Sequence, residues 1–123
     1  MLLNSIDYKV LNGDKDNFED VTIYKLGEHY TVYKNSYKLQ SGKVLVNFSV
    51  EVSYEDRMNN YIPEIYYDDD FSFLKAKEGV KAKPKFTIQT TAYGSMNVEE
   101  INKVIAGYQE AVEAAKILNM NFC

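Results

Sequence analysis

Apolar and polar residues alternate along the first two-thirds of the chain, a pattern typical of strands with one buried face. The clearest run covers residues 44–54, where apolar side chains occupy every second position. One wet face indicates an antiparallel sheet, since parallel strands are usually covered on both faces. Shorter runs of the same kind predict further strands at residues 6–10, 21–26, 30–34, 65–73 and 85–91.

Turn-forming residues separate these runs. Asn12-Gly13 and Ser41-Gly42 mark two turns, and a loop of about three residues, 27–29, predicts a hairpin. The lysine-rich segment 75–85 contains Gly79 and Pro84, which indicates an exposed loop. The strands therefore follow one another through short connections.

The apolar period changes to that of a helix near the C-terminus. Asn97 is a good N-cap, and Glu100 supplies the partner of a capping box. From Val98 the pattern predicts a helix of about 21 residues, roughly 31 Å long, that ends at Leu118 and Asn119. Its apolar stripe is formed by positions 101, 105, 108, 112, 115 and 118.

This helix is expected to cover the sheet, because no other segment has its length and stripe. We therefore predict an α+β fold in which an antiparallel β-sheet of about five to six strands packs on a long C-terminal α-helix. Residues 1–123 are expected to form a single domain, as is ordinary for this length.

The helix also has a face of small residues. This face fits either close packing on the sheet or contact with a second copy of the chain. One helix and a small sheet leave many aromatic side chains to cover, and a two-fold dimer is the commonest solution. We expect a homodimer or a higher homo-oligomer. The small residues are Ala106, Gly107, Ala111, Ala114 and Ala115.

Composition narrows the function classes. The net charge is −4 and the pI is about 5.0, which disfavours a general nucleic-acid binder that neutralises phosphates. The chain has eleven tyrosines and no tryptophan, so it is rich in rings with a polar edge. No signal peptide and no apolar stretch of membrane-spanning length is evident, so a cytoplasmic protein is expected.

The residues for catalysis are sparse. His29 is the only histidine and is expected to be exposed in a turn, and Cys123 is the only cysteine. Asp68, Asp69 and Asp70 lack the spacing of a calcium loop and are expected to form a solvated turn. No glycine-rich phosphate loop is present. We therefore expect no enzymatic activity, no metal and no cofactor.

One stretch, YEDRMNNY at residues 54–61, favours a binding site. Arg57 is the only arginine, and its planar fork suits phosphate and stacks on rings. Asparagines suit a base edge or a ribose, and aromatic rings suit stacking. The alternative is that Arg57 pairs with Glu55 or Asp56 at a strand end. The candidate ligand-binding residues are Arg57, Asn59, Asn60, Tyr61, Tyr54, Phe71 and Phe73, with Tyr66 nearby.

The layout of an antiparallel sheet followed by KFTIQTTAYGSMNVEEINKVIAGYQEAVEAAKIL resembles the Thoeris anti-defence signal-sponge family of phages and prophages. The resemblance implies a homo-oligomer in the host bacterial cytoplasm that binds a cyclic ADP-ribose-type nucleotide signal. Such proteins sequester the signal without degrading it, using aromatic stacking on adenine and arginine contacts to phosphate.

Two other functions stay open. The acidic charge and Asp68–Asp70 fit a protein-binding inhibitor of a host defence effector, comparable to an anti-CRISPR protein. A sheet followed by a helix also fits a phage structural component.

Overall fold

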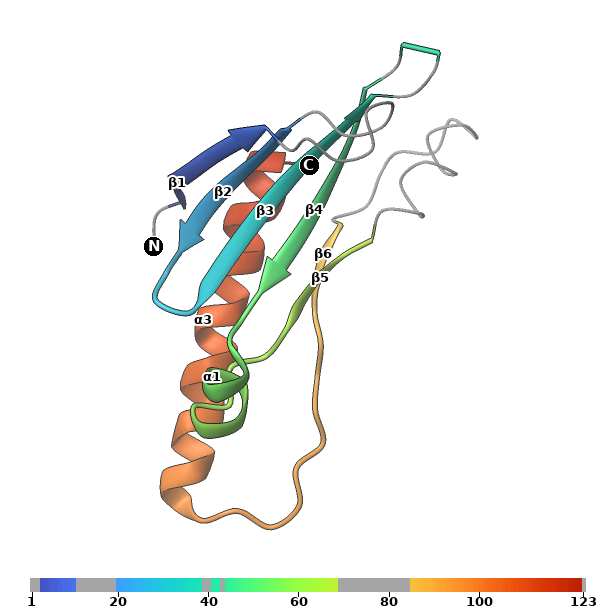
Figure 1. Cartoon of the computed structure of the whole chain (residues 1–123). Coiled ribbons are helices and arrows are strands. Elements are labelled where there is room, and N and C mark those ends of the chain that lie inside the picture. Colours follow the sequence, from blue (N-terminus) through green and yellow to red (C-terminus); the bar gives the residue numbers. More distant parts are fainter. Residues whose placement is uncertain (1–2, 11–19, 39–40, 43, 69–84, 123) are drawn as a thin grey trace, which may run out of the picture.

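A computed structural model describes residues 3–10, 20–38, 41–42, 44–68 and 85–122 (Figure 1). These residues form an α+β fold with antiparallel sheets and a long C-terminal helix, α3. The predicted class is therefore confirmed. The prediction of one sheet is wrong, because the described strands divide into a four-stranded sheet and a two-stranded sheet.

The larger sheet is a meander whose strand order, β1-β2-β3-β4, follows the chain. All three pairings are antiparallel, as the one-sided alternation predicted. The predicted hairpin at residues 27–29 is confirmed: Gly27 turns the chain with a φ of 63°, and Leu26 pairs with Tyr30. The strands are β1 (Leu3–Val10), β2 (Asp20–Leu26), β3 (Tyr30–Lys38) and β4 (Val44–Glu51).

Strand β4 is shorter than its alternation predicted. It ends at Glu51, and Ser53 begins a short helix, α1 (Tyr54–Asn59). The Ser53 hydroxyl accepts a hydrogen bond from the backbone N–H of Asp56 at 3.1 Å, which is N-cap geometry. The alternation of apolar residues therefore extends through Val52 and Tyr54, beyond the end of the strand. The N-cap at Ser53 determines that a helix begins there instead.

The second sheet pairs β5 (Ile65–Tyr67) with β6 (Phe86–Ile88), and β5 lies beside β4. These strands are shorter than the runs 65–73 and 85–91 that predicted them. Two backbone bonds extend the pairing, from Asp68 N–H to Lys85 O and from Gln89 N–H to Glu64 O, both at 2.9 Å. Most of the predicted lysine-rich loop, with Asp69 and Asp70, lies outside the described residues, as does the predicted turn Asn12-Gly13.

Helix α3 (Val98–Phe122) has 25 residues and begins as predicted. Asn97 Oδ1 accepts from the Glu100 N–H at 2.8 Å, and Glu100 Oε1 accepts from the Asn97 N–H at 3.2 Å. The capping box is therefore confirmed. The predicted end at Leu118 and Asn119 is wrong, because the ring of Phe122 packs 4.6 Å from that of Phe48 and the last turn is held by this contact.

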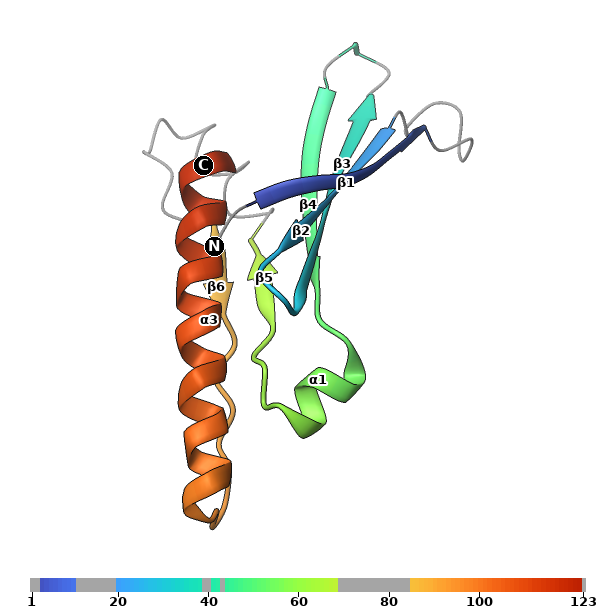
Figure 2. The same cartoon turned by 90° about the vertical axis from the view of Figure 1, so that its left-hand side faces the viewer.

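Helix α3 lies along one face of the four-stranded sheet, with β5 and β6 beside it (Figure 2). The side chains that it buries are mostly small ones. Of the predicted apolar stripe, only positions 115 and 118 are buried, whereas Ile101, Ile105 and Val112 are exposed. The buried residues of α3 are Gly107, Ala111, Ala114, Ala115 and Leu118.

Helix α3 buries small residues because the side chains that face it are large. Tyr30, Phe48 and Phe86 occupy the core, and close packing on such rings needs small residues on the other side. Apart from Ala106, which is exposed, the small face of α3 therefore packs against the rest of the fold. The interpretation of the larger stripe as the core face is wrong for its N-terminal part.

Candidate functional site

Arg57 lies within helix α1 and is held by a carboxylate from the chain that follows. Its Nη1 donates to Glu64 Oε1 at 2.7 Å. Arg57 therefore does not lie at a strand end, and the alternative pairing with Glu55 or Asp56 is wrong. The short helix reverses the chain, so Glu64, seven positions later, becomes the partner of Arg57. A prediction based on a continuing strand does not foresee this pairing.

Two exposed tyrosine rings lie on this ion pair. The Arg57 Cζ is 5.7 Å from the centre of the Tyr54 ring, a cation–π distance. The Tyr66 hydroxyl donates to Glu64 Oε2 and lies 2.8 Å from the amide oxygen of Gln89. Tyr54 is 69% exposed and Tyr66 is 51% exposed. We call Tyr54, Arg57, Glu64, Tyr66 and Gln89 the Arg57 cluster.

The charges of the Arg57 cluster are internally balanced. The hydrogen bond to Glu64, together with burial and the negative charge of that carboxylate, raises the pKa of Tyr66, while Arg57 lowers it. The phenol therefore stays neutral and acts as a donor. The Nε of Arg57 is buried and has no hydrogen-bond partner among the described residues. Because Nε is closed to solvent, a ligand could reach only the other nitrogens of this guanidinium, whose side chain is 39% exposed.

The remaining predicted site residues are not all brought together. The Asn60 amide donates to Asp56 Oδ1 at 3.0 Å, and this bond is the main reason that the pKa of Asp56 is lowered. Asn60 therefore serves the end of α1. Asn59 is exposed, and Phe71 and Phe73 lie outside the described residues.

Tyr61 contacts a different part of the molecule. Its hydroxyl donates to Glu100 Oε2 at 3.0 Å, and its ring meets that of Tyr93 edge-on at 5.4 Å. Its φ of 55° places it in the left-handed region, next to the residue where α1 ends. Tyr61 therefore joins α1 to the start of α3, and none of these partners belongs to the Arg57 cluster.

His29 is not a free turn residue, contrary to expectation. Its Nδ1 lies 2.7 Å from Glu110 Oε2 on α3, and its Nε2 lies 4.0 Å from Asp56 Oδ1 on α1. The ring therefore links the β2–β3 turn to both helices. Sequence spacing gave no signal for this contact, because the three residues are far apart in the chain and meet only when α3 docks.

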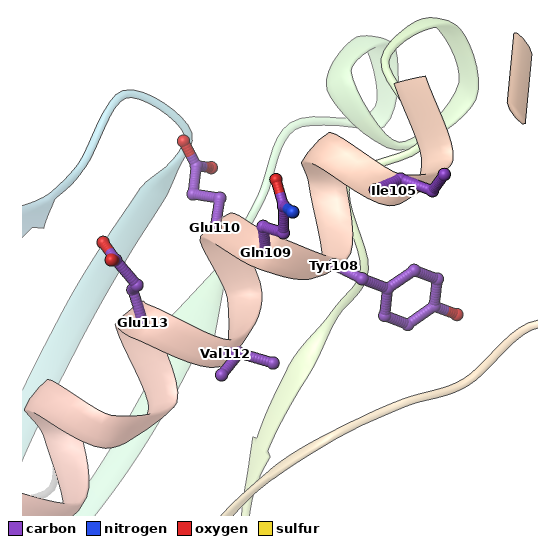
Figure 3. Close-up of a pocket in the computed structure, with 6 residues that line it drawn as sticks. All are labelled: Ile105, Tyr108, Gln109, Glu110, Val112 and Glu113. Carbon is purple, nitrogen blue, oxygen red and sulfur yellow. The ribbon is translucent and has the colours of Figure 1, made fainter. Parts of the chain in front are cut away.

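A shallow hollow lies on the surface of α3 (Figure 3). Its volume, about 820 Å³, is in the range of ligand pockets, but every described residue that lines it comes from one helix. Two of its lining side chains are carboxylates, which would repel a phosphate. It is lined by Ile105, Tyr108, Gln109, Glu110, Val112 and Glu113, none of them a predicted site residue.

The described residues contain no group of three or more histidine, cysteine, aspartate or glutamate side chains placed to hold a metal ion. Within the same ranges, no helix is long and apolar enough to cross a membrane. Comparison with known proteins found no matching family model, no matching curated protein and no matching solved structure. The candidate site must therefore be judged on its own chemistry.

Proposed function

We propose that this protein is a non-enzymatic binding protein that captures a small nucleotide signal on the Arg57 cluster. One observation carries the proposal: a partly exposed guanidinium lies 5.7 Å from the centre of the exposed Tyr54 ring, and its carboxylate partner, Glu64, also holds the exposed Tyr66 phenol. Exposed rings stack on bases of any sequence, and a guanidinium binds phosphate oxygens through several donors. Both parts of a nucleotide would find a partner within one small surface.

Glu64 defines how such a ligand would bind. In the free protein this carboxylate satisfies both Arg57 Nη1 and the Tyr66 hydroxyl. A phosphate would share Arg57 with Glu64 or displace it, while Glu64 could accept a hydrogen bond from a ribose hydroxyl. The proposal therefore requires a ligand that carries phosphate and sugar together, because phosphate alone would have to compete with an ion pair already formed.

The cyclic ADP-ribose class is the ligand that the resemblance to phage anti-defence sponges implies. On this proposal the protein sequesters the signal intact in the host bacterial cytoplasm, so that the host effector stays inactive. The alternative of an acidic inhibitor gains no support from the described residues. Of its three aspartates only Asp68 is described, and its backbone pairs with Lys85 in the small sheet.

Thermal melting with cyclic ADP-ribose isomers tests the proposal. At a ligand concentration of 100 times Kd, binding adds about 2.7 kcal/mol to the free energy of unfolding. For a chain of this size that is a rise in Tm of roughly 10 °C. Arg57→Gln should abolish the rise. Lys103→Gln, which removes one exposed positive charge from α3, is the matched control and should keep it.

Recovery of the ligand separates capture from catalysis. Mass spectrometry of the solution after heat denaturation should return the nucleotide at its original mass and in a stoichiometric amount. A hydrolysed product would contradict sequestration. A Tm that no isomer changes at millimolar concentration, or a rise that Arg57→Gln retains, would contradict the assignment to the Arg57 cluster.

A further inference from the structure

Helix α3 carries a second apolar stripe that no described residue of the fold buries. Its four aliphatic members are exposed by 76% at Val98, 43% at Ile101, 50% at Ile105 and 42% at Val112. Tyr108, which is partly buried, completes the stripe. The steps between the five positions alternate between three and four residues, the spacing of a seam between two helices. We call these five residues the outer stripe.

The outer stripe is distinct from the face that packs on the sheet. At 100° per residue, its centre lies about 115° around the helix axis from the buried residues of α3. The N-terminal half of α3 also extends beyond the end of the four-stranded sheet (Figures 1 and 2). The packing that covers Ala111, Ala114 and Leu118 therefore cannot also cover the outer stripe.

The outer stripe is held in place from the side. The Tyr108 hydroxyl accepts a hydrogen bond from the Thr91 N–H at 2.9 Å, which fixes the ring against the segment before α3. The capping box at Asn97 and Glu100 fixes the first turn. Little side-chain or backbone freedom would be lost at this end of the helix on binding, which favours association.

We infer that the outer stripe is the seam of a homodimer, in which α3 of one copy packs on α3 of the other. A two-fold axis makes such a stripe meet itself, with its middle residue, Ile105, close to the axis. The two ends are alike, since Val98 and Val112 each lie seven residues from Ile105. The inference goes beyond the proposed function and does not depend on it.

The charges beside the outer stripe are compatible with a second copy of the chain. Beside the outer stripe lie the neutral amides Asn102 and Gln109 and, next to Val112 at its C-terminal end, the opposite charges of Glu113 and Lys116. A two-fold axis near Ile105 places the two copies of each of these charges at opposite ends of the seam, so two acidic chains can meet there without facing like charges.

The area is sufficient for a small dimer. The exposed fractions correspond to on the order of 350 Å² of aliphatic surface per copy, within the range of a functional patch. Two copies of this surface, together with Tyr108 and the bordering amides, would bury a total of about 1,000 Å². Specific interfaces begin near that area. The expected dimer is therefore reversible, with a concentration-dependent mass.

Sedimentation velocity over a hundredfold range of concentration tests the seam. The unaltered chain should move from monomer to dimer, and Ile105→Glu should weaken the dimer at least a hundredfold. Met120→Glu is the matched control: Met120 is 82% exposed on the same helix but lies off the outer stripe, so the dimer should persist. Circular dichroism should show equal helix content in all three proteins. If Ile105→Glu loses helix, Ile101→Asn replaces it.

Cross-linking locates the axis independently. In a Cys123→Ser background, Ile105→Cys should form a disulfide between copies under mild oxidation, whereas Met120→Cys should not. The inference is overturned if the chain stays monomeric over the whole concentration range. That outcome includes a monomer in which another segment of the same chain protects the outer stripe from hydrogen exchange. A dimer that survives Ile105→Glu with its helix intact overturns it as well.

Discussion

The two halves of α3 differ in the apolar side chains that they carry and in whether the fold buries them. The C-terminal half packs small residues, Ala111, Ala114 and Ala115, against the aromatic face of the sheet, with Leu118 as the one large member. The N-terminal half presents larger aliphatic residues, such as Ile101 and Ile105, that the described fold leaves exposed. On this helix, a large apolar side chain is therefore a poor indicator of burial.

The difference teaches that a packing face is set by both surfaces. The two sheets supply volume through the rings of Tyr30, Phe48 and Phe86, so the helix must supply small side chains that leave room for them. Beyond the end of the four-stranded sheet the helix no longer needs small side chains, and it can carry larger ones suited to another partner. The boundary lies near Gly107, where a Cβ would approach the Tyr61 carbonyl oxygen to 2.6 Å.

The largest expected effect comes from the buried half. Leu118 is fully buried, and Leu118→Ala should lower the free energy of unfolding by about 2–5 kcal/mol through lost burial and the cavity left behind. Ile101→Ala, in the outer stripe of the N-terminal half, should cost less than about 1 kcal/mol, measured by urea unfolding at a concentration that keeps the chain monomeric. Equal losses at the two positions would contradict the division of the helix.

The boundary residue should respond next most strongly. Gly107→Ala would normally favour a helix by about 1 kcal/mol. Here the new Cβ meets the backbone of Tyr61, so we expect a net loss of roughly 1–3 kcal/mol from overpacking.

Gly94→Ala is the control for the boundary. A Cβ at Gly94 has no heavy atom within 4 Å, so this substitution should change the unfolding midpoint little. A stabilised Gly107→Ala would show that the chain around Tyr61 yields, and that α1 is not fixed to α3 at this point.

The smallest effect is expected at Tyr30, which lies under the middle of α3. Its hydroxyl donates to the Pro63 carbonyl at 2.6 Å, and Tyr30→Phe should cost about 1 kcal/mol at neutral pH. Burial, and secondarily the charge of Glu110, raises the pKa of Tyr30 well above its usual value.

The pH dependence follows from that direction. Below pH of about 10 the phenol is neutral in both the folded and the unfolded chain. As pH rises further, the unfolded chain loses the proton first, so the folded state loses stability. Tyr30→Phe lacks this loss, so the difference in urea midpoint between the two proteins should narrow above that pH. A constant difference would mean that the phenol ionises freely in the folded protein.

Local patterns predicted much of the fold. The hairpin at Gly27, the antiparallel pairing and the capping box at Asn97 each depend on residues close together in the chain. The predictions that were wrong depend on distant contacts. The end of α3 is set by the rings that Phe122 meets on the sheet, and the buried face of α3 is set by the bulk of those rings.

The candidate site shows the same limit. Sequence reasoning identified Arg57 and Tyr54, which the structure brings together. It missed Glu64. The alternation through Val52 and Tyr54 predicted a continuing strand, so it gave no sign that α1 reverses the chain and brings Glu64 to Arg57. The capping signal of Ser53 with Asp56 three residues later was the one clue to that helix.

The strand order of the larger sheet bears on how the chain folds. Because β1 to β4 pair in chain order, each hairpin closes a short loop, and the sheet can assemble quickly by successive local steps. Helix α3 follows every described strand, so during synthesis the aromatic face that includes Tyr30 and Phe48 is made before its cover exists. Until α3 docks, that face is the part of the nascent chain most exposed to aggregation and to chaperones.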